Sequence, residues 1–170
     1  MIKALLHSKV VKKTYEVSPI LDGGISYTTE RVGQASKIGF NILKNGEINY
    51  HEGDLFQSFI DNKPFCSGTV FAKSKKQDVI TTTAWDLLRY LKYKQSYLIQ
   101  KMTLSQVVKL IAEEFSLPLG EVENTKYVMP KKLYEDKSLM DIITDCIQIT
   151  AVATKKIYVL FDNFGKLSLK

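Results

Sequence analysis

The sequence predicts a mainly β protein with an α+β part: a small antiparallel β-barrel followed by a small α+β domain with two helices and a closing hairpin. Three observations predict this fold class. Short runs of alternating apolar and polar residues fill the first half, turn residues separate them at close intervals, and sustained helical spacing of apolar residues begins only in the second half. With 170 residues, 45% of them hydrophobic, the chain can form one ordinary domain or two small ones. We expect the barrel domain to be residues 1–95 and the α+β domain residues 96–170.

The first half contains seven predicted strands, each a short run with β-type alternation or β-branched residues. They are Ile2–Leu6, Thr14–Val17, Ile25–Glu30, Lys37–Leu43, Leu55–Ile60, Phe65–Lys73 and Val79–Ala84. Turn signals at Asp22-Gly23-Gly24, Asn45-Gly46 and Asp61–Pro64 suit antiparallel hairpins. Strands in this number without an intervening helix favour a small barrel or sandwich. One or two helical turns are expected at Trp85–Leu91, and the domain boundary near residues 94–96.

The glycines between Leu21 and Ile42 raise the question of a phosphate-binding loop. Such a loop needs glycines at fixed spacing with a helix immediately after them. Gly33 is instead followed by Ile38, Phe40 and Ile42 in strand alternation. The glycines are therefore expected at the corners of a sheet.

The second half predicts two helices and a hairpin. Apolar residues recur on one helical face of Met102–Phe115, with Thr103 as the N-cap and Gln106 completing a capping box. A second helix is expected to begin at Ser138. The runs Ile157–Phe161 and Lys166–Leu169 predict the closing hairpin.

The charge distribution and the cysteine content make several classes of protein less favoured, among them nucleic-acid-binding and disulfide-rich secreted proteins. The net charge of +6 and the pI near 9.1 come from charges spread along the chain, which is a weak signal for nucleic acid. Cys66 and Cys146 lie far apart in apolar surroundings, so we expect buried free thiols in a reducing compartment. Neither a signal peptide nor a membrane-spanning run is recognised, and no membrane partner is expected.

Motifs for catalysis are scarce. His51, Glu52 and Asp54 are potential ligands or acids, but neighbouring residues on an extended chain point to opposite faces and cannot all converge. A polar turn is the better interpretation. Glu113 and Glu114 are adjacent on a helix and so diverge around its axis. The sequence predicts that the protein is not an enzyme, with no catalytic residue, no metal ligand and no cofactor.

Two basic segments have alternative interpretations. Tyrosines and basic residues alternate in Arg89–Tyr97. This mixture is typical either of a surface that stacks nucleic-acid bases or of packed tyrosines flanked by lysines whose charges stay in solvent. The second is favoured, because one short stripe falls short of a clustered basic face, so nucleic acid is an unlikely partner. Lys73–Asp78 is interpreted as a solvated hairpin tip.

Several stretches, taken in order, carry a resemblance to a known family. They are YEVSPILDGGISYTTERVGQASKIGFNILK (15–44), EGD (52–54), PFCSGTVFAKSKK (64–76), AWDLLRYLK (84–92) and YVLFDNFGKLSL (158–169). The chain resembles the baseplate hub proteins of contractile phage tails and phage-like particles, specifically the hubs of PBSX-type prophages (tail hub, or late control protein D-like). The resemblance covers almost the whole chain.

The resemblance implies a structural protein whose barrel continues the tail tube and seats the central spike within a trimeric ring. The expected partners are copies of itself, the tail tube protein, the spike and other baseplate proteins. The expected location is the bacterial cytoplasm during assembly, and afterwards the baseplate of the tail. Family members are about twice this length, so the chain is expected to be an amino-terminal part of a longer hub.

Residues at loops and hairpin tips are the candidates for contact between subunits, against the alternative of ordinary exposed turns. They are Arg31, Gln34, Lys37, Lys73, Lys75 and Lys76. Two other functions remain open. A cell-wall (peptidoglycan or glycan) binding module is suggested by the helix-strand pattern of Thr103–Met129, and a cell-wall hydrolase would need acidic residues converging in a cleft.

Overall fold

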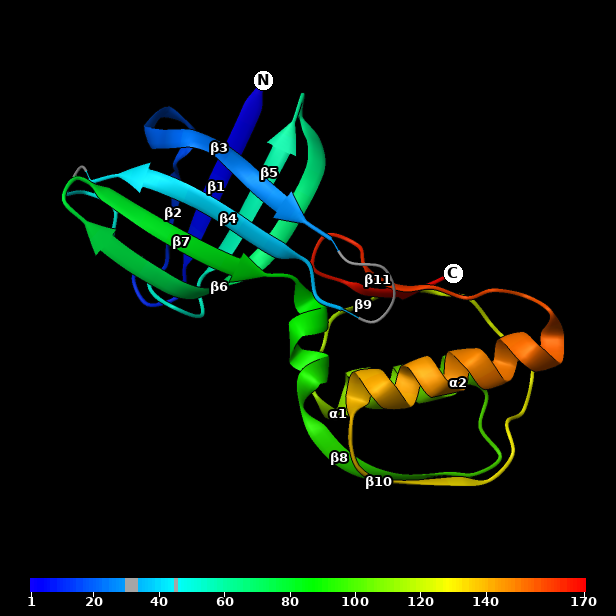
Figure 1. Ribbon diagram of the computed structural model, residues 1–170. Helices are drawn as coiled ribbons and strands as arrows, with labels where there is room; N and C mark the ends of the chain where they lie inside the picture. The colour runs from blue at the N-terminus through cyan, green and yellow to red at the C-terminus, as the bar shows by residue number, and fades with distance from the viewer. Residues whose placement is uncertain (30–33, 45) are drawn as a thin grey trace. The chain divides into compact units, whose positions relative to one another are not determined.

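The computed structural model describes residues 1–29, 34–44 and 46–170, and its contacts divide the chain into two compact units (Figure 1). Unit 1 comprises residues 1–29 and 35–86, and unit 2 comprises residue 34 and residues 87–170. The boundary expected near residues 94–96 lies inside unit 2 by this division. The reason is that the strand covering those residues pairs with a strand about 40 residues later in the same unit.

Unit 1 is a seven-stranded antiparallel sheet in the order β2-β1-β5-β6-β7-β4-β3. The strands are β1 (Ile2–Ser8), β2 (Lys13–Glu16), β3 (Leu21–Thr28), β4 (Lys37–Leu43), β5 (Leu55–Ile60), β6 (Lys63–Lys76) and β7 (Val79–Trp85), with the short 3₁₀ helix η1 (Ser18–Ile20) before β3. All seven predicted strands form within the described residues; Glu30, the predicted end of the third strand, lies outside them.

The outcome differs among the turns that the sequence predicts. Asp61 and Asn62 adopt positive φ angles and join β5 to β6, as predicted. Gly23 and Gly24 do not end a strand: they lie within β3, where the register against β4 shifts between Leu21 and Ile25. Gly33 and the turn expected around it lie mostly outside the described residues.

The sheet curls until its two halves face each other. The 14-residue β6 pairs with β5 through its first part and with β7 through its last, and its register shifts between Val70 and Ala72. A shift of this kind bends the strand. The bend brings Phe40 of β4 onto Phe56 of β5, whose rings stack with centroids 4.1 Å apart, although β6 and β7 separate the two strands within the sheet. In Figure 1, β4 and β7 run across the direction of β1 and β5.

Close packing of the two halves depends on Gly68. A Cβ at this position would lie 2.8 Å from the Ile38 side chain and 2.8 Å from the Trp85 carbonyl oxygen, so only glycine fits. The enclosed core consists of fully or nearly fully buried apolar residues. They are Ala4, Leu6, Tyr15, Val17, Ile38, Phe40, Ile42, Tyr50, Phe56, Cys66, Val70, Ile80 and Ala84.

The expected closed barrel is not what the strand order shows. In the part of the chain that the structure describes, β2 and β3 are the ends of the sheet, and each pairs with a single neighbour. The mainly β class is correct, but unit 1 is a curled open sheet. Closure would require β3 to pair with the opposite half, and there the contact is made by side chains: Tyr27 of β3 meets Phe65 of β6 edge-to-face, with centroids 5.5 Å apart.

Unit 2 contains both α-helices and two small sheets. Its elements are η2 (Leu87–Lys92), β8 (Lys94–Ile99), α1 (Leu104–Glu114), β9 (Leu119–Val122), β10 (Lys132–Ser138), α2 (Leu139–Thr154), β11 (Leu160–Asp162) and β12 (Leu167–Leu169). β8 pairs with β10, while β12 pairs with β11 on one side and runs parallel to β9 on the other. The helical turns after Trp85 and the closing hairpin are confirmed.

Both helix starts are also confirmed. The Thr103 side chain accepts the Gln106 N–H, and the Gln106 side-chain oxygen accepts the Thr103 N–H, which completes the capping box at the start of α1. Ser138 caps α2 by accepting the Asp141 N–H at 3.0 Å. No helix among the described residues has the length and apolar content needed to cross a bilayer.

Candidate assembly surface

The acidic turn at residues 51–54 is structural. Asp54 is 1% exposed, and its carboxylate accepts the backbone N–H groups of Lys9 and His51, both at 2.8 Å. Burial acts to raise the pKa of this carboxyl, but the hydrogen bonds from Lys9, His51 and the Ser8 side chain outweigh it and leave the pKa lowered. Asp54 therefore fastens the loop after β1 to the turn before β5, as the interpretation of a polar turn predicts.

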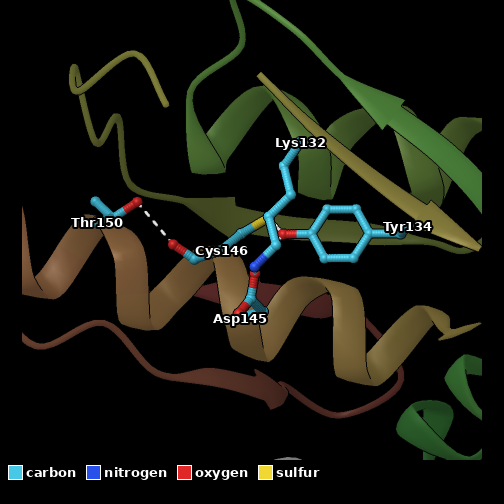
Figure 2. Close-up of polar contacts among 5 residues, drawn as sticks. All are labelled: Lys132, Tyr134, Asp145, Cys146 and Thr150. Carbon is cyan, nitrogen blue, oxygen red and sulfur yellow. Dashed lines mark hydrogen bonds and ion pairs between the residues drawn. The ribbon is translucent and has the colours of Figure 1, made fainter. Parts of the chain in front are cut away.

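Both cysteines are buried free thiols, as predicted. Cys146 of α2 lies in a small polar cluster with residues of β10 and its own helix (Figure 2). The Tyr134 hydroxyl lies 3.7 Å from its sulfur and donates to Asp145, and Lys132 Nζ reaches the same carboxylate at 2.6 Å.

This cluster joins β10 to α2 and does not activate the thiol. Burial raises the pKa of Cys146 to about 11, so at neutral pH it is a neutral thiol, and thiols react as nucleophiles in the thiolate form. Burial and the hydrogen bond to Asp145 likewise raise the pKa of Tyr134. Among the described residues, no group of three or more His, Cys, Asp or Glu side chains could hold a metal ion.

The two ends of the curled sheet differ in how they are protected. β2 has four residues, Lys-Thr-Tyr-Glu, and carries charge at both ends, which discourages pairing with another chain. β3 has eight residues and carries no charge from Gly23 to Thr28. A run of six uncharged residues in an end strand offers other chains a template for strand addition, so β3 is the candidate edge for assembly.

The predicted contact lysines lie beside opposite ends of β7: Lys37 is on β4, and Lys75 and Lys76 are on β6. Lys37 is exposed at the start of β4 and pairs with Trp85 at one end of β7, while Gln34 is exposed and belongs to unit 2. Lys75 and Lys76 are exposed where β6 pairs with the other end of β7, at Ile80 and Val79. They do not form one site.

Two of the six predicted contact residues differ from the others. Lys73 is half-buried: its Nζ donates to the Tyr50 carbonyl and lies 4.9 Å from the centroid of the Tyr50 ring. This engagement leaves Lys73 less able to contact a neighbour than the lysines that follow it. Arg31 lies outside the described residues. The edge of β3 was not singled out from the sequence, and the signal that could have found it is the absence of charge from Gly23 to Thr29.

The chain thus combines a curled, open antiparallel sheet with a small α+β unit. A family model described as YQBQ-like matches residues 25–170, and the chain belongs to this family.

Curated relatives come from Bacillus subtilis (strain 168). The uncharacterized protein YqbQ is 29% identical over 167 residues, which cover 95% of this chain and 51% of that protein. The phage-like element PBSX protein XkdQ is 28% identical over 134 residues, 76% of this chain and 41% of that protein. The likeness to PBSX-type proteins expected from the sequence is confirmed. The chain spans about half the length of the curated relatives it matches.

Solved structures share the fold across 99% of this chain. The prophage MuSo2 43 kDa tail protein of Shewanella oneidensis has a TM-score of 0.70 at 15% identity, with 52% of its chain covered. A tail protein of Neisseria meningitidis MC58 has a TM-score of 0.69 at 14% identity, with 50% covered. The prophage tail protein gp18 of Listeria monocytogenes EGD-e has a TM-score of 0.64 at 10% identity, also with 50% covered.

Proposed function

We propose that this protein is a structural component of the tail of a phage or phage-like particle, and specifically the baseplate hub that joins the tail tube to the central spike through a trimeric ring. The proposal rests on two findings together: the sequence similarity to a PBSX protein and the fold shared with three tail proteins. The role is one of shape and contact, without catalysis.

The geometry of unit 1 supplies a mechanism. β3 is uncharged from Gly23 to Thr28 and stands at one end of the strand order among the described residues, and a strand from a neighbouring subunit continues the sheet at that edge. Repeating this heterologous contact around a rotation axis closes a ring. On this proposal the protein assembles with copies of itself, the tube and the spike in the bacterial cytoplasm, and then resides in the baseplate.

Co-assembly tests the proposal. The complete gene product is expressed with the tube and spike proteins encoded beside it, and the mixture is examined by electron microscopy and by light scattering after size exclusion. We expect trimeric rings at the junction of tube and spike. A gene product that stays monomeric and binds neither partner would falsify the hub role.

The alternative, a cell-wall-binding module, receives no particular support. The segment that suggested it forms α1, β9 and a bridge between Thr103 and Val128 inside unit 2. Sedimentation of the chain with purified peptidoglycan checks it directly, and depletion of the chain from the supernatant would favour the alternative.

A further inference from the structure

The two-stranded ribbon of β8 and β10 presents a pair of exposed leucines. Leu98 and Leu133 lie directly opposite each other in the register, and they are 51% and 59% exposed. Directly opposed residues project from the same face of a ribbon. The two side chains therefore form one apolar patch, which we call the leucine pair.

The opposite face of the ribbon is already covered. Ile99 and Tyr134, on the positions next to the leucine pair, are 1% and 7% exposed. Tyr97 donates its hydroxyl to Glu114 of α1, and Lys132 binds Asp145 of α2. Both helices thus pack on one side of the ribbon, and the leucine pair is on the other. In Figure 1, β8 and β10 lie below the helices of this unit.

The segments that form the ribbon and its flanks carry a surplus of positive charge. Residues 92–101 and 126–138 contain seven lysines and two acidic residues, a surplus of five. The remaining 147 residues contain 17 basic and 16 acidic residues, so almost all of the net charge of +6 belongs to the ribbon and its flanks. Asp136 is paired with Lys94 at 3.5 Å. Five further lysines of these segments are exposed: Lys92, Lys101, Lys126, Lys131 and Lys137.

The surplus of lysines in and around the ribbon favours an acidic binding partner. A second copy of the ribbon would place lysines against lysines, which like-charge repulsion disfavours. A single-stranded nucleic acid would need aromatic rings for stacking. The outer face offers leucines instead, while Tyr97 and Tyr134 are turned toward the helices. We propose that the outer face of the β8–β10 ribbon is a docking surface for an acidic amphipathic segment of another protein, whose apolar residues cover the leucine pair and whose carboxylates meet the surrounding lysines.

This inference stands apart from the hub proposal, because it rests only on the burial and charge of the ribbon. The test uses the 170-residue chain, labelled with ¹⁵N. The probe is a fluorescent 18-residue amphipathic peptide with leucines on one face and glutamates on the other, and its control is a peptide of the same composition in scrambled order. We expect the patterned peptide to bind and to shift the amide signals of β8 and β10.

Substitutions separate the leucine pair from general electrostatics. The double variant Leu98→Thr, Leu133→Thr places threonine, a β-branched residue that favours strands, at both positions, and we expect it to weaken binding about tenfold or more. The matched control, Val152→Thr, changes an apolar residue of α2 that is 71% exposed, and it should leave binding unchanged.

Each other outcome overturns the proposal. Failure of the patterned peptide to bind, or binding equal to that of the scrambled peptide, removes the docking surface. Stronger binding of a single-stranded oligonucleotide, or of vesicles containing phosphatidylserine, through the same residues would assign the surface to nucleic acid or to a membrane. Dimerisation of the chain that depends on the leucine pair would assign it to a second copy.

Discussion

The buried carboxylate of Asp54 holds together segments of unit 1 that are far apart in the sequence. It receives two backbone N–H groups from segments 45 and three residues away, and its own carbonyl accepts the Val70 N–H at 2.8 Å. Hydrogen bonds to a buried charged group contribute more than neutral ones, and losing one leaves a donor unsatisfied. Asp54 therefore joins β1, β5 and β6 near the turn at residues 51–54.

We predict that Asp54→Asn lowers the free energy of unfolding of unit 1 by about 2 kcal/mol at pH 7, because the amide can accept only one of the two N–H groups. The effect should depend on pH. The pKa of Asp54 is lowered in the folded protein, so its ionised form stabilises the fold above the unfolded value of about 3.9, and that contribution is lost as the pH falls through the lowered folded pKa. Urea unfolding followed by the fluorescence of Trp85, the single tryptophan, at pH 7 and pH 3 measures this.

The matched control is Asp61→Asn, the same chemical change at a side chain that is 76% exposed. Asp61 contacts the terminal amine, but an exposed ion pair contributes little, and we expect a change below about 0.5 kcal/mol. Equal effects of the two substitutions at pH 7 would mean that the hydrogen bonds of Asp54 are not the source of the stability.

Among the strands, β3 carries the assembly argument, and its edge can be blocked without disturbing the fold. A Cβ at Gly24 would meet nothing within 4 Å, and its φ lies outside the left-handed region, so a longer side chain is tolerated there. We predict that Gly24→Lys leaves the unfolding free energy within about 0.5 kcal/mol of the wild type and abolishes ring formation by the complete gene product, because a charge on an edge opposes strand addition. Electron microscopy and light scattering report the ring.

The control for this prediction is Thr81→Lys. Thr81 is exposed on β7, which has β4 on one side and β6 on the other, so the added charge is the same but no edge is blocked. Rings formed by Gly24→Lys as by the wild type would show that assembly does not use β3, and loss of rings in both variants would point to charge in general.

A strand can be predicted from the sequence when its partner is close along the chain or when its residues alternate between buried and exposed. The strands of unit 1 pair through short hairpins or show alternation on one buried face, so Ile38, Phe40 and Ile42 identify β4 from the sequence alone. β8 and β10 lack both signals: α1 lies between them, β10 reads Lys-Leu-Tyr-Glu-Asp-Lys-Ser, and the register shift between Tyr134 and Lys137 breaks its alternation. Residues 94–96 therefore resembled a linker.

The same reasoning applies to the assembly surface. Lysines at hairpin tips are visible in a sequence, which is why Lys73, Lys75 and Lys76 were singled out. Whether a lysine is engaged within its own chain depends on a distant partner, such as Tyr50 for Lys73, 23 residues earlier. The position of β3 at the end of the sheet depends likewise on the complete strand order, which no local pattern contains.

At the scale of the whole molecule, each of the two units buries its own set of apolar residues. The core of unit 1 gathers residues between Ala4 and Ala84. Unit 2 buries its own apolar set, which includes Leu91, Ile111, Ile143 and Leu169 at 0% exposure. Two spectroscopic signals separate the units, because Trp85 belongs to unit 1 and both α-helices belong to unit 2.

We predict that each core can be weakened without the other. Leu6→Ala should destabilise unit 1 by about 3 kcal/mol and move the urea transition seen by Trp85 fluorescence, while the transition in helical ellipticity at about 222 nm stays in place. Ile143→Ala should do the reverse, by a similar amount. If both variants instead move both signals together, the two units unfold as one cooperative system, and the substitutions at Asp54 and Gly24 would then have to be interpreted as acting on the chain as a whole.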